Sequence, residues 1–526
     1  MATLPLQPDS LPQTGDSKIV SASSLRLSLP QPPRMFYRHG WQSWSLAAWT
    51  DLTPLPVQRP TLLHPMQLDP AYANETEPNS SWVAAVELAK DDILLLGALG
   101  LEAHVTLHGT DLEGIYESGE GEWFIARGYE ASVFTKYTDE LAKRLGKRSD
   151  RLTPRVWCSW YSLYTAIDEP TLYSAFDGLG DLPFDILQVD DGWQVSIGDW
   201  QVNSKFPSGM NALADRIKST GRKAGLWLAP LIAQESSRLF RGHSDWFLHD
   251  TQGKFVSAGF NWGEQLYALD TTHPAALEWL AALMKQVRAW GFDYLKLDFL
   301  YAGALPGKRH MDMPRETAYR QGIKVMREAM GADAYFLTCG APILPSMGLC
   351  DAIRVGTDVS GKWEDHRDAI LLYNPTTPGT RNAIRNTINR LWLQPLVATD
   401  PDVVYFVEKE NSLSPEHKRL LQDLALVSDF KATSDLPQWM STAERESLHE
   451  FLKLDPKVKR LSRTKFQIDD RVVDFSSALF LPKPPTGLTQ IQGAFIGWLG
   501  NQSLALKLLK KIDDLSFKRK KQALKS

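Results

Sequence analysis

The sequence predicts an α/β fold: a (β/α)8 TIM barrel with an N-terminal antiparallel β domain before it and a small C-terminal β domain after it. Strand-like runs alternate with helical segments from about residue 149 to 450, which is the pattern of parallel βαβ units, and eight such units close a barrel. Residues 35 to 148 instead carry short apolar segments separated by Asp, Gly and Asn, and residues 451 to 526 carry weaker strand signals. The predicted domains are 1–148, 149–450 and 451–526.

Composition limits the class of protein. At 526 residues with 43% hydrophobic content, the chain is long enough for two or three well-buried domains. The net charge of -4 favours neither nucleic acid nor an anionic membrane as a partner. The start lacks the features of a secretory signal, and no apolar run reaches membrane-spanning length. Cys158, Cys339 and Cys350 are too few, and odd in number, for a disulfide framework, so we expect a soluble cytoplasmic protein.

Two N-terminal segments carry separate predictions. Residues 1 to 34 are rich in Pro, Ser and Gln, and we expect a loosely held arm there. Residues 39–45, HGWQSWS, place two Trp three positions apart around a Gln. Taken alone, these two rings are most simply a packed aromatic pair in a loop.

The predicted barrel strands are continuous apolar runs, as buried parallel strands require. The first six are RVWCSWY (155–161), DILQVDDGW (185–193), KAGLWLAP (223–230), FDYLKLDF (292–299), AYFLTCG (334–340) and DAIRVGTD (351–358). The segments LWLQPLVATDPDVVYF and ALVSDFKATSDL can supply the seventh and eighth. Among the helices between them, the one before strand four opens at Pro274 and stops at Gly291, as helix start and stop signals should.

Beyond residue 450 the signals weaken. We expect strands in KFQIDDRVVDFSSALFL and TQIQGAFIGWL, forming a small β domain packed on the barrel. The final stretch is strongly basic. Because the cluster is short and the chain is negative overall, a solvated end is a better interpretation than a tail that binds nucleic acid or membrane.

Polar side chains gather where the predicted barrel strands end, and barrel active sites lie at the carboxyl ends of strands. They are Trp160, Asp190, Asp191, Trp227, Lys296, Asp298, Cys339, Arg354 and Asp358. A single polar residue at a strand end is unremarkable, but this many predict a polar pocket. On the fourth strand Lys296 and Asp298 share one face, which by itself fits a structural ion pair as well as a site.

Two carboxylates facing each other across a barrel mouth suit glycosidic bond cleavage, and Asp298 and Asp358 are the candidates. We expect Lys296 to favour the charged form of Asp298, and the nearby ring of Trp363 to make Asp358 the more easily protonated partner. Arg354 is suited to bind substrate hydroxyls or the surroundings of the nucleophile rather than to donate a proton.

The remaining candidates fit a sugar-binding pocket. Asp190 and Asp191 offer paired acceptors for hydroxyls on adjacent carbons, although DDGW taken alone is more simply a turn sequence with an N-cap. Trp160 and Trp227 offer walls for the apolar face of a sugar. No His and Cys cluster has metal-ligand spacing, and neither a dinucleotide-binding glycine motif nor a phosphate-binding loop is present, so we expect no metal and no cofactor.

The motifs VWCSWYSLY, QVDDGW, GLWLAP, YLKLDFLYAG, LTCGAPILP and IRVGTD occur in this order within residues 155 to 440. This arrangement closely resembles glycoside hydrolase family 36, the retaining α-galactosidases, and in particular its compact bacterial members. The resemblance implies an N-terminal β-sandwich, a (β/α)8 barrel and a C-terminal β-sandwich. The loop HGWQSWS resembles one that the family's N-terminal domain lays over the active site, which implies that Trp41 or Trp44 caps the sugar.

The resemblance also implies roles for single residues. Asp298, in the KxD motif, would be the nucleophile, and Asp358, in the RxxxD motif, the acid/base. Asp190 and Asp191 would hold the 4- and 6-hydroxyls of galactose. Six further residues would line the sugar subsite: Trp160, Trp227, Lys296, Cys339, Gly340 and Arg354. The implied substrate is an oligosaccharide with a terminal α-galactose, and no nucleic acid or membrane partner is expected.

Other functions stay open at this stage. Small residues at Gly340 and Ala341 leave room for an acetamido group, so an α-N-acetylgalactosaminidase is one alternative, and an α-galactosyltransferase is another. A non-catalytic carbohydrate-binding protein is a third, because a fold does not guarantee an activity.

Overall fold

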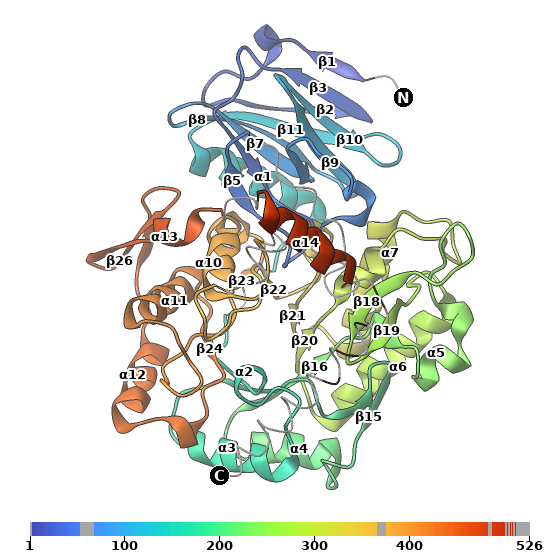
Figure 1. Ribbon diagram of the computed structural model, residues 1–526, viewed down its shortest axis with the longest axis vertical. Coiled ribbons are helices and arrows are strands. Elements are labelled where there is room, and N and C mark those ends of the chain that lie inside the picture. The colour runs from blue at the N-terminus through green and yellow to red at the C-terminus, as the bar shows by residue number, and fades with distance from the viewer. Residues whose placement is uncertain are drawn as a thin grey trace.

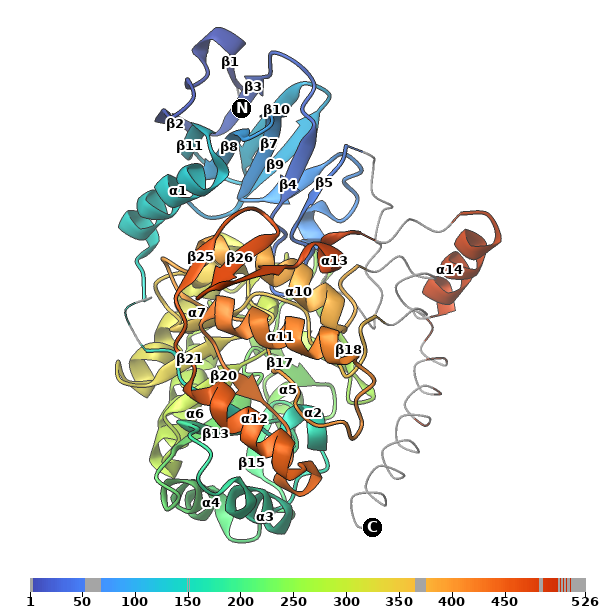
Figure 2. The same ribbon diagram turned by 90° about the vertical axis from the view of Figure 1, so that its left-hand side faces the viewer.

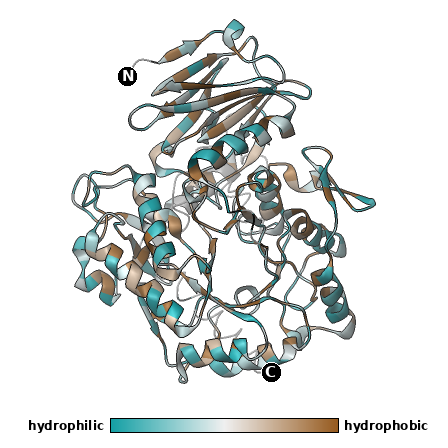
Figure 3. Ribbon diagram, turned by 180° about the vertical axis from the view of Figure 1, so that it is seen from behind, coloured by the Kyte–Doolittle hydropathy of each residue, from teal (hydrophilic) through white to brown (hydrophobic). Residues whose placement is uncertain are grey.

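The structure, a computed structural model, describes residues 3–52, 68–148, 150, 152–364, 375–481 and 486–499 of the 526-residue chain, together with residues 502, 505, 508 and 511. An N-terminal pair of sheets sits above a barrel, and the elements formed by residues 442–479 lie against the barrel's side (Figure 1). The outer barrel helices alternate between hydrophobic and hydrophilic residues along their length, as amphipathic helices do (Figure 3).

The N-terminal part consists of two largely antiparallel sheets packed face to face. One sheet has the order β1 (Leu4–Leu6), β3 (Ser24–Ser28), β10 (Asp111–Tyr116), β9 (Ala103–His108) and β6 (Asn79–Ser81). The other has the order β2 (Ser17–Ala22), β11 (Gly121–Gly128), β8 (Asp92–Ala98), β7 (Val83–Ala89), β4 (Met35–Arg38) and β5 (Ala48–Thr50). The sheets pack so closely that a Cβ on Gly114 of β10 would lie 2.7 Å from the ring of Trp123 on β11. This arrangement is a β-sandwich.

The expectation of a loose N-terminal arm is wrong. Residues 4–28 supply the three strands β1, β2 and β3, and β3 pairs with both β1 and β10. The reason is the alternation in SLRLS, which turns Leu25 and Leu27 into the core of the sandwich, where both are fully buried. Overall Pro and Ser content concealed this short alternating run.

Eight parallel strands form the predicted barrel, and the (β/α)8 prediction is confirmed. In chain order they are β12 (Val156–Cys158), β13 (Ile186–Val189), β16 (Lys223–Leu228), β20 (Tyr294–Leu297), β21 (Tyr335–Thr338), β22 (Ala352–Arg354), β23 (Ala398–Asp400) and β24 (Ala432–Thr433). β24 pairs with β12, and a bridge joins Thr433 of β24 to Val404 in the segment that follows β23. The strands are shorter than the apolar runs that predicted them, so Trp160 lies outside the first strand and begins α2 (Trp160–Leu163).

Helices surround these strands, and Figure 2 shows them on the outside of the barrel. They include α3 (Glu169–Leu179), α4 (Gly209–Lys218), α6 (Pro274–Trp290), α7 (Arg315–Met330), α8 (Ile343–Ser346), α10 (Thr380–Ile388) and α11 (Pro415–Ser428). As predicted, α6 begins at Pro274, and Gly291 caps its end with a left-handed φ of 101°. An earlier helix, α1 (Glu130–Leu145), connects the sandwich to the barrel.

Insertions enlarge the loops that follow the second and third barrel strands. They form the hairpin of β14 (Gln194–Ser196) and β15 (Asp199–Val202), and a sheet of β17 (Ile232–Gln234), β19 (Glu264–Ala268) and β18 (Ser257–Asn261), with α5 (Arg238–Gly242) between β17 and β18. Short 3-10 helices occupy Pro8–Ser10, Pro70–Tyr72, Ser244–Trp246, Leu300–Ala304, Leu391–Leu393 and Pro437–Trp439. No helix in the described part of the chain combines the length and the apolar character needed to cross a membrane.

The C-terminal part contains a small antiparallel sheet. Its strands are β25 (Val458–Arg460), β26 (Lys465–Ile468) and β27 (Arg471–Asp474), with α12 (Thr442–Lys453) before them and α13 (Ser476–Leu479) after them. The strand predicted in TQIQGAFIGWL is wrong, because this segment is the helix α14 (Leu488–Leu499). Four of its apolar residues, Leu488, Ile491, Phe495 and Trp498, are spaced three and four positions apart, which belongs to a helix. Most of the basic end lies outside the described residues.

Candidate active site

The barrel places most of the predicted site residues at the carboxyl ends of five consecutive strands. Asp190 and Asp191 follow β13, Trp227 lies near the end of β16, and Lys296 and Asp298 lie on and just beyond β20. Cys339 follows β21, and Arg354 is the last residue of β22. All seven side chains are buried.

Asp298 is held by two N–H donors. The indole Nε1 of Trp227 donates to Oδ2 at 3.0 Å, and the backbone N–H of Phe299 donates to Oδ1 at 2.7 Å. Phe299 adopts a left-handed φ of 54°, an uncommon conformation for a bulky residue and a frequent sign of a functional turn. The two donors fix the carboxylate at the strand end, and its side chain is not free to turn.

Lys296 pairs with Asp190 on a different strand. Its Nζ lies 2.9 Å from Oδ2 of Asp190, which also accepts from Nε2 of Gln188 at 2.7 Å. Burial alone lowers the pKa of Lys296, but the contact with Asp190 raises it well above its usual value, so the ammonium stays charged. We expected Lys296 to pair with Asp298, but in the structure its ion-pair partner is Asp190.

Asp191 is held by two side chains that the sequence did not point to. Nε2 of Gln194 donates to its Oδ1 at 2.5 Å, and Nε1 of Trp262 donates to its Oδ2 at 2.7 Å. Burial raises the pKa of Asp191 to about 6, and the two hydrogen bonds oppose that rise. Trp262 lies in the turn between β18 and β19, and no local pattern connects it to Asp191, which is 71 residues away.

Asp358 is the more accessible carboxyl of the predicted pair. Its side chain is 34% exposed, and its Oδ1 accepts from Nη1 of Arg354 at 3.1 Å. Burial in the barrel mouth raises its pKa, and the negative charge of Asp298 adds to the rise, against the opposing charges of Arg354 and Lys296. Trp363, which was expected beside Asp358, stacks on His417 with ring centroids 3.8 Å apart.

Arg354 is surrounded by acids. Besides Asp358, its guanidinium contacts Oδ2 of Asp400 through Nε and Oδ1 of Asp402 through Nη2, both at 2.9 Å. Burial lowers the pKa of Arg354, but Asp400 and Asp402 raise it well above the usual value. Neither Asp400 nor Asp402 was predicted as a site residue, although the motif TDPD at residues 399–402 carries both at the end of the seventh strand.

Gly340 lies where a side chain has no room. Its φ of 52° is left-handed, and a Cβ there would lie 3.1 Å from the ring of Trp44 and 3.3 Å from the backbone nitrogen of Phe299. The neighbouring Cys339 is almost fully buried, and that burial raises the pKa of its thiol well above the usual value, so it stays a thiol.

Trp44 and Trp41 have different positions. The ring of Trp44 packs edge-on against Phe299, with centroids 5.5 Å apart, and over Gly340. Trp41 is only 1% exposed and donates from Nε1 to Oε1 of Glu316 at 3.3 Å. The structure therefore brings Trp44 to the strand ends and places Trp41 in the junction between the sandwich and the barrel.

The two expected sugar-stacking rings also differ. Trp227 is buried and is used as a donor to Asp298. Trp160 is partly exposed and meets Tyr164 edge-on at 5.1 Å between ring centroids. Within the described residues, no group of three or more His, Cys, Asp or Glu side chains is arranged as a metal site.

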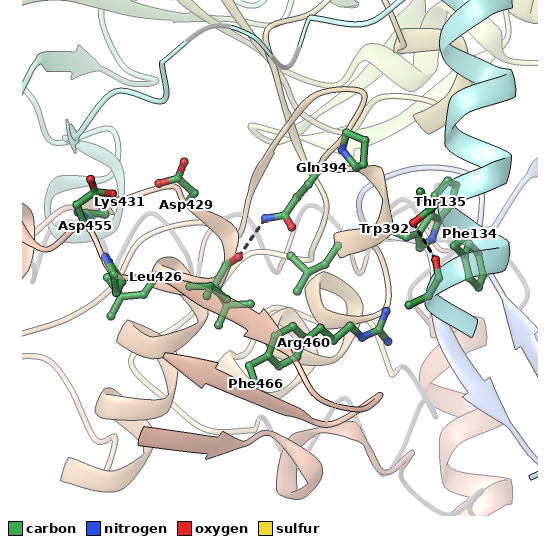
Figure 4. Close-up of a pocket in the computed structure, with 16 residues that line it drawn as sticks. Phe134, Thr135, Trp392, Gln394, Leu426, Asp429, Lys431, Asp455, Arg460 and Phe466 are labelled. Carbon is green, nitrogen blue, oxygen red and sulfur yellow. Dashed lines mark hydrogen bonds between the residues drawn. The ribbon is translucent and has the colours of Figure 1, made fainter. Parts of the chain in front are cut away.

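A separate cavity of about 490 Å³ lies where α1 meets the barrel and the C-terminal sheet (Figure 4). Its wall includes Phe134, Trp392, Arg460 and Phe466. None of the predicted site residues lines it, so it is not part of the candidate active site.

Comparisons with known proteins fit this geometry. The family model described as Melibiase matches residues 129–330. A solved structure of TtGalA, an alpha-galactosidase from Thermus thermophilus, in complex with p-nitrophenyl alpha-D-galactopyranoside, has a TM-score of 0.81 and 43% sequence identity, and the match covers 89% of this chain and 97% of that one. The same enzyme in complex with stachyose has a TM-score of 0.79 and 44% identity, covering 84% of this chain and 97% of that one.

More distant relatives match over shorter segments. Alpha-galactosidase AgaA of Geobacillus stearothermophilus is 30% identical over 215 residues, which is 38% of this chain and only 28% of that protein's length. Its crystal structure, described as a GH36 alpha-galactosidase, shares the fold, with a TM-score of 0.54 at 16% identity, covering 82% of this chain and 61% of that one.

Proposed function

This chain belongs to glycoside hydrolase family 36, and on that premise we propose that it is a retaining α-galactosidase that removes terminal α-galactosyl residues from oligosaccharides such as stachyose and raffinose. The observation that carries the proposal is the unequal environment of two acids at one barrel mouth. Asp298 is fixed by two N–H donors, whereas Asp358 is partly exposed and has a raised pKa. Double displacement requires this division of labour.

In the first step Asp298 is the nucleophile. One of its carboxylate oxygens forms a bond to the anomeric carbon of galactose as the bond from that carbon to the glycosidic oxygen breaks. The donors Trp227 and Phe299 hold the carboxylate in place, so little reorientation is needed before attack. The product of this step is a covalent galactosyl ester on Asp298.

Asp358 supplies and then removes the proton. In the first step its carboxyl is the proton donor, a role that the raised pKa favours, and the proton passes to the departing glycosidic oxygen. In the second step the resulting carboxylate takes a proton from water, whose oxygen attacks the anomeric carbon and releases Asp298. Two inversions at one carbon retain the α configuration.

The remaining predicted residues are proposed to bind the sugar. Asp190 and Asp191 accept hydrogen bonds from the 4- and 6-hydroxyls, and Lys296, held by Asp190, donates to a neighbouring oxygen. Arg354, Cys339 and Gly340 line the same subsite, with Trp160 and Trp44 at its edge.

Trp44 favours galactose over N-acetylgalactosamine. The notion that Gly340 leaves room for an acetamido group considers that residue alone, but the ring of Trp44 fills the space beside it. This observation makes the α-N-acetylgalactosaminidase alternative the weaker one. We also propose a cytoplasmic location, which is supported by three buried cysteines that form no disulfide.

The test is hydrolysis of p-nitrophenyl α-galactoside and stachyose by the wild-type protein and by Asp298→Asn. We expect initial release of the α anomer, read by NMR, and a loss of turnover of about 1,000-fold or more in the variant with an unchanged melting temperature. Asp312→Asn, which changes an exposed acid, is the matched control. Initial release of β-galactose, or near-normal turnover by Asp298→Asn, would refute the proposal.

A further inference from the structure

We propose that Asp402 is a positioning residue for catalysis: it competes with Asp358 for the guanidinium of Arg354 and so keeps the transferable proton on Asp358. This inference rests on the proposed role of Asp358 as acid/base and assigns a function to a residue that the proposed mechanism does not use. Both carboxyl oxygens of Asp402 face protein groups, Oδ1 towards Arg354 and Oδ2 towards Tyr161 and Val359, so it acts through Arg354 rather than by touching the sugar.

The geometry of Arg354 makes this competition possible. A guanidinium presents its donors in one fixed plane, and here three carboxyls occupy three different nitrogens. Nη1 contacts Asp358 at 3.1 Å, whereas Nη2 contacts Asp402 and Nε contacts Asp400, both at 2.9 Å. The two buried acids are thus the closer partners, and the catalytic acid makes the longest contact of the three.

Asp402 cannot withdraw from this arrangement. The hydroxyl of Tyr161 and the backbone N–H of Val359, the latter at 2.9 Å, both donate to its Oδ2, which leaves Oδ1 facing Arg354. Its own backbone N–H donates to Oδ1 of Asp400 at 2.8 Å, and its φ of 84° is left-handed. Val359 directly follows Asp358, so Asp402 also holds the backbone that carries the catalytic acid.

The charges around Asp402 and Asp358 explain why these two acids are not both ionised readily. The titratable or charged groups that face Asp402 or Asp358 are Tyr161, Tyr164, Asp190, Lys296, Asp298, Cys339, Arg354, Asp400 and Tyr405. Only Lys296 and Arg354 are positive, and Lys296 already pairs with Asp190. Three ionised carboxyls around the single charge of Arg354 would leave an excess of negative charge in a buried site, which is unfavourable.

Asp402 acts on the proton of Asp358 when it is itself ionised. Burial raises the pKa of Asp402 to about 7, with Arg354 opposing and Asp358 adding to the rise. When Asp402 is ionised, it draws on the charge of Arg354, and less of that charge stabilises the anion of Asp358. Asp358 then keeps its proton to higher pH, which the first chemical step requires.

The test is the pH profile of kcat/KM for Asp402→Asn with stachyose as substrate. Removal of the negative charge leaves Arg354 more available to the anion of Asp358, so the alkaline limb should move to lower pH by about 1 unit. Because p-nitrophenol needs little protonation to leave, p-nitrophenyl α-galactoside should lose less rate than stachyose in the same variant. Asp185→Asn, which removes one carboxylate beside Arg155 at the opposite end of the barrel strands, should leave the limb in place.

Tyr161→Phe keeps the inference testable if Asp402→Asn does not fold. Loss of the hydroxyl donor makes the anion of Asp402 less stable, so the limb should move in the same direction by a smaller amount. An alkaline limb that stays in place, or moves to higher pH, in folded Asp402→Asn or in Tyr161→Phe would overturn the inference. A wild-type protein that hydrolyses neither substrate would instead overturn the proposed function, so the two failures are distinguishable.

Discussion

Arg390 donates a hydrogen bond from Nη2 to the backbone oxygen of Gln42, 2.9 Å away and 348 residues earlier in the chain. The same nitrogen bonds the oxygens of His39 and Ser45, and Nη1 bonds those of Ser43 and Val355. One fully buried side chain from the barrel therefore holds the whole loop that carries Trp44. This support matters because buried carbonyl groups without partners are costly.

Arg390→Met should release this loop. Four loop carbonyls lose a charged donor, and we expect the free energy of unfolding to fall by about 3 kcal/mol and KM for p-nitrophenyl α-galactoside to rise about 10-fold as Trp44 loses its position. Chemical unfolding and steady-state kinetics measure the two effects. Arg222→Met, which removes bonds to the oxygens of Gly180 and Leu182, should lower stability without changing KM. Equal effects of the two variants on KM would contradict the role of Arg390.

Asp358→Ala should separate substrates by leaving group. The oligosaccharide expelled from stachyose is a poor leaving group that needs a proton, so turnover of stachyose should fall by about 1,000-fold. The glycosylation step with a nitrophenyl leaving group should fall far less. Azide, which needs no general base to attack the galactosyl ester, should restore turnover on the nitrophenyl substrate and yield α-galactosyl azide. The measurement is product analysis with and without azide. An identical loss on both substrates, with no azide adduct, would exclude Asp358 as the acid/base.

Trp262→Phe should shift the pH at which the sugar binds. The indole N–H stabilises the anion of Asp191, so its loss raises the pKa of that carboxyl further above about 6. The variant then needs a higher pH to ionise Asp191, and KM should rise about 10-fold at pH 6 but much less at pH 8. KM measured across pH 5 to 9 provides the test. A KM that rises equally at every pH would indicate lost packing rather than a changed charge.

Trp44→Ala should relax the choice of sugar. Removal of the ring opens space beside Gly340, so the ratio of rates on the nitrophenyl α-N-acetylgalactosaminide and α-galactoside should rise about 10-fold. Trp41→Phe is the matched control, because Trp41 is buried in the domain junction and its loss should alter stability but not this ratio. An unchanged ratio in Trp44→Ala would show that another group excludes the acetamido substituent.

Sequence patterns succeeded where the signal is local. The eight barrel strands and the bounds of α6 follow from apolar runs and from Pro274 and Gly291, which act on their immediate neighbours. They failed where composition obscured a short pattern: Leu25 and Leu27 alternate within a Pro- and Ser-rich segment. They failed again in α14, where a short apolar segment predicted a strand although it forms a helix.

By itself the sequence determined which side chains stand at the barrel strand ends, because that placement depends only on the order of strand and helix along the chain. The tertiary structure decided their partners: Lys296 pairs with Asp190 rather than with Asp298, Trp227 binds a carboxylate rather than forming a wall, and Asp402 shares Arg354 with Asp358. The physical reason is closure of the barrel. Closure brings together Lys296 and Asp190, which are 106 positions apart, and Trp227 and Asp298, which are 71 apart. Because these polar groups are buried, leaving any of them without a partner would cost free energy, so each pairing is strongly favoured.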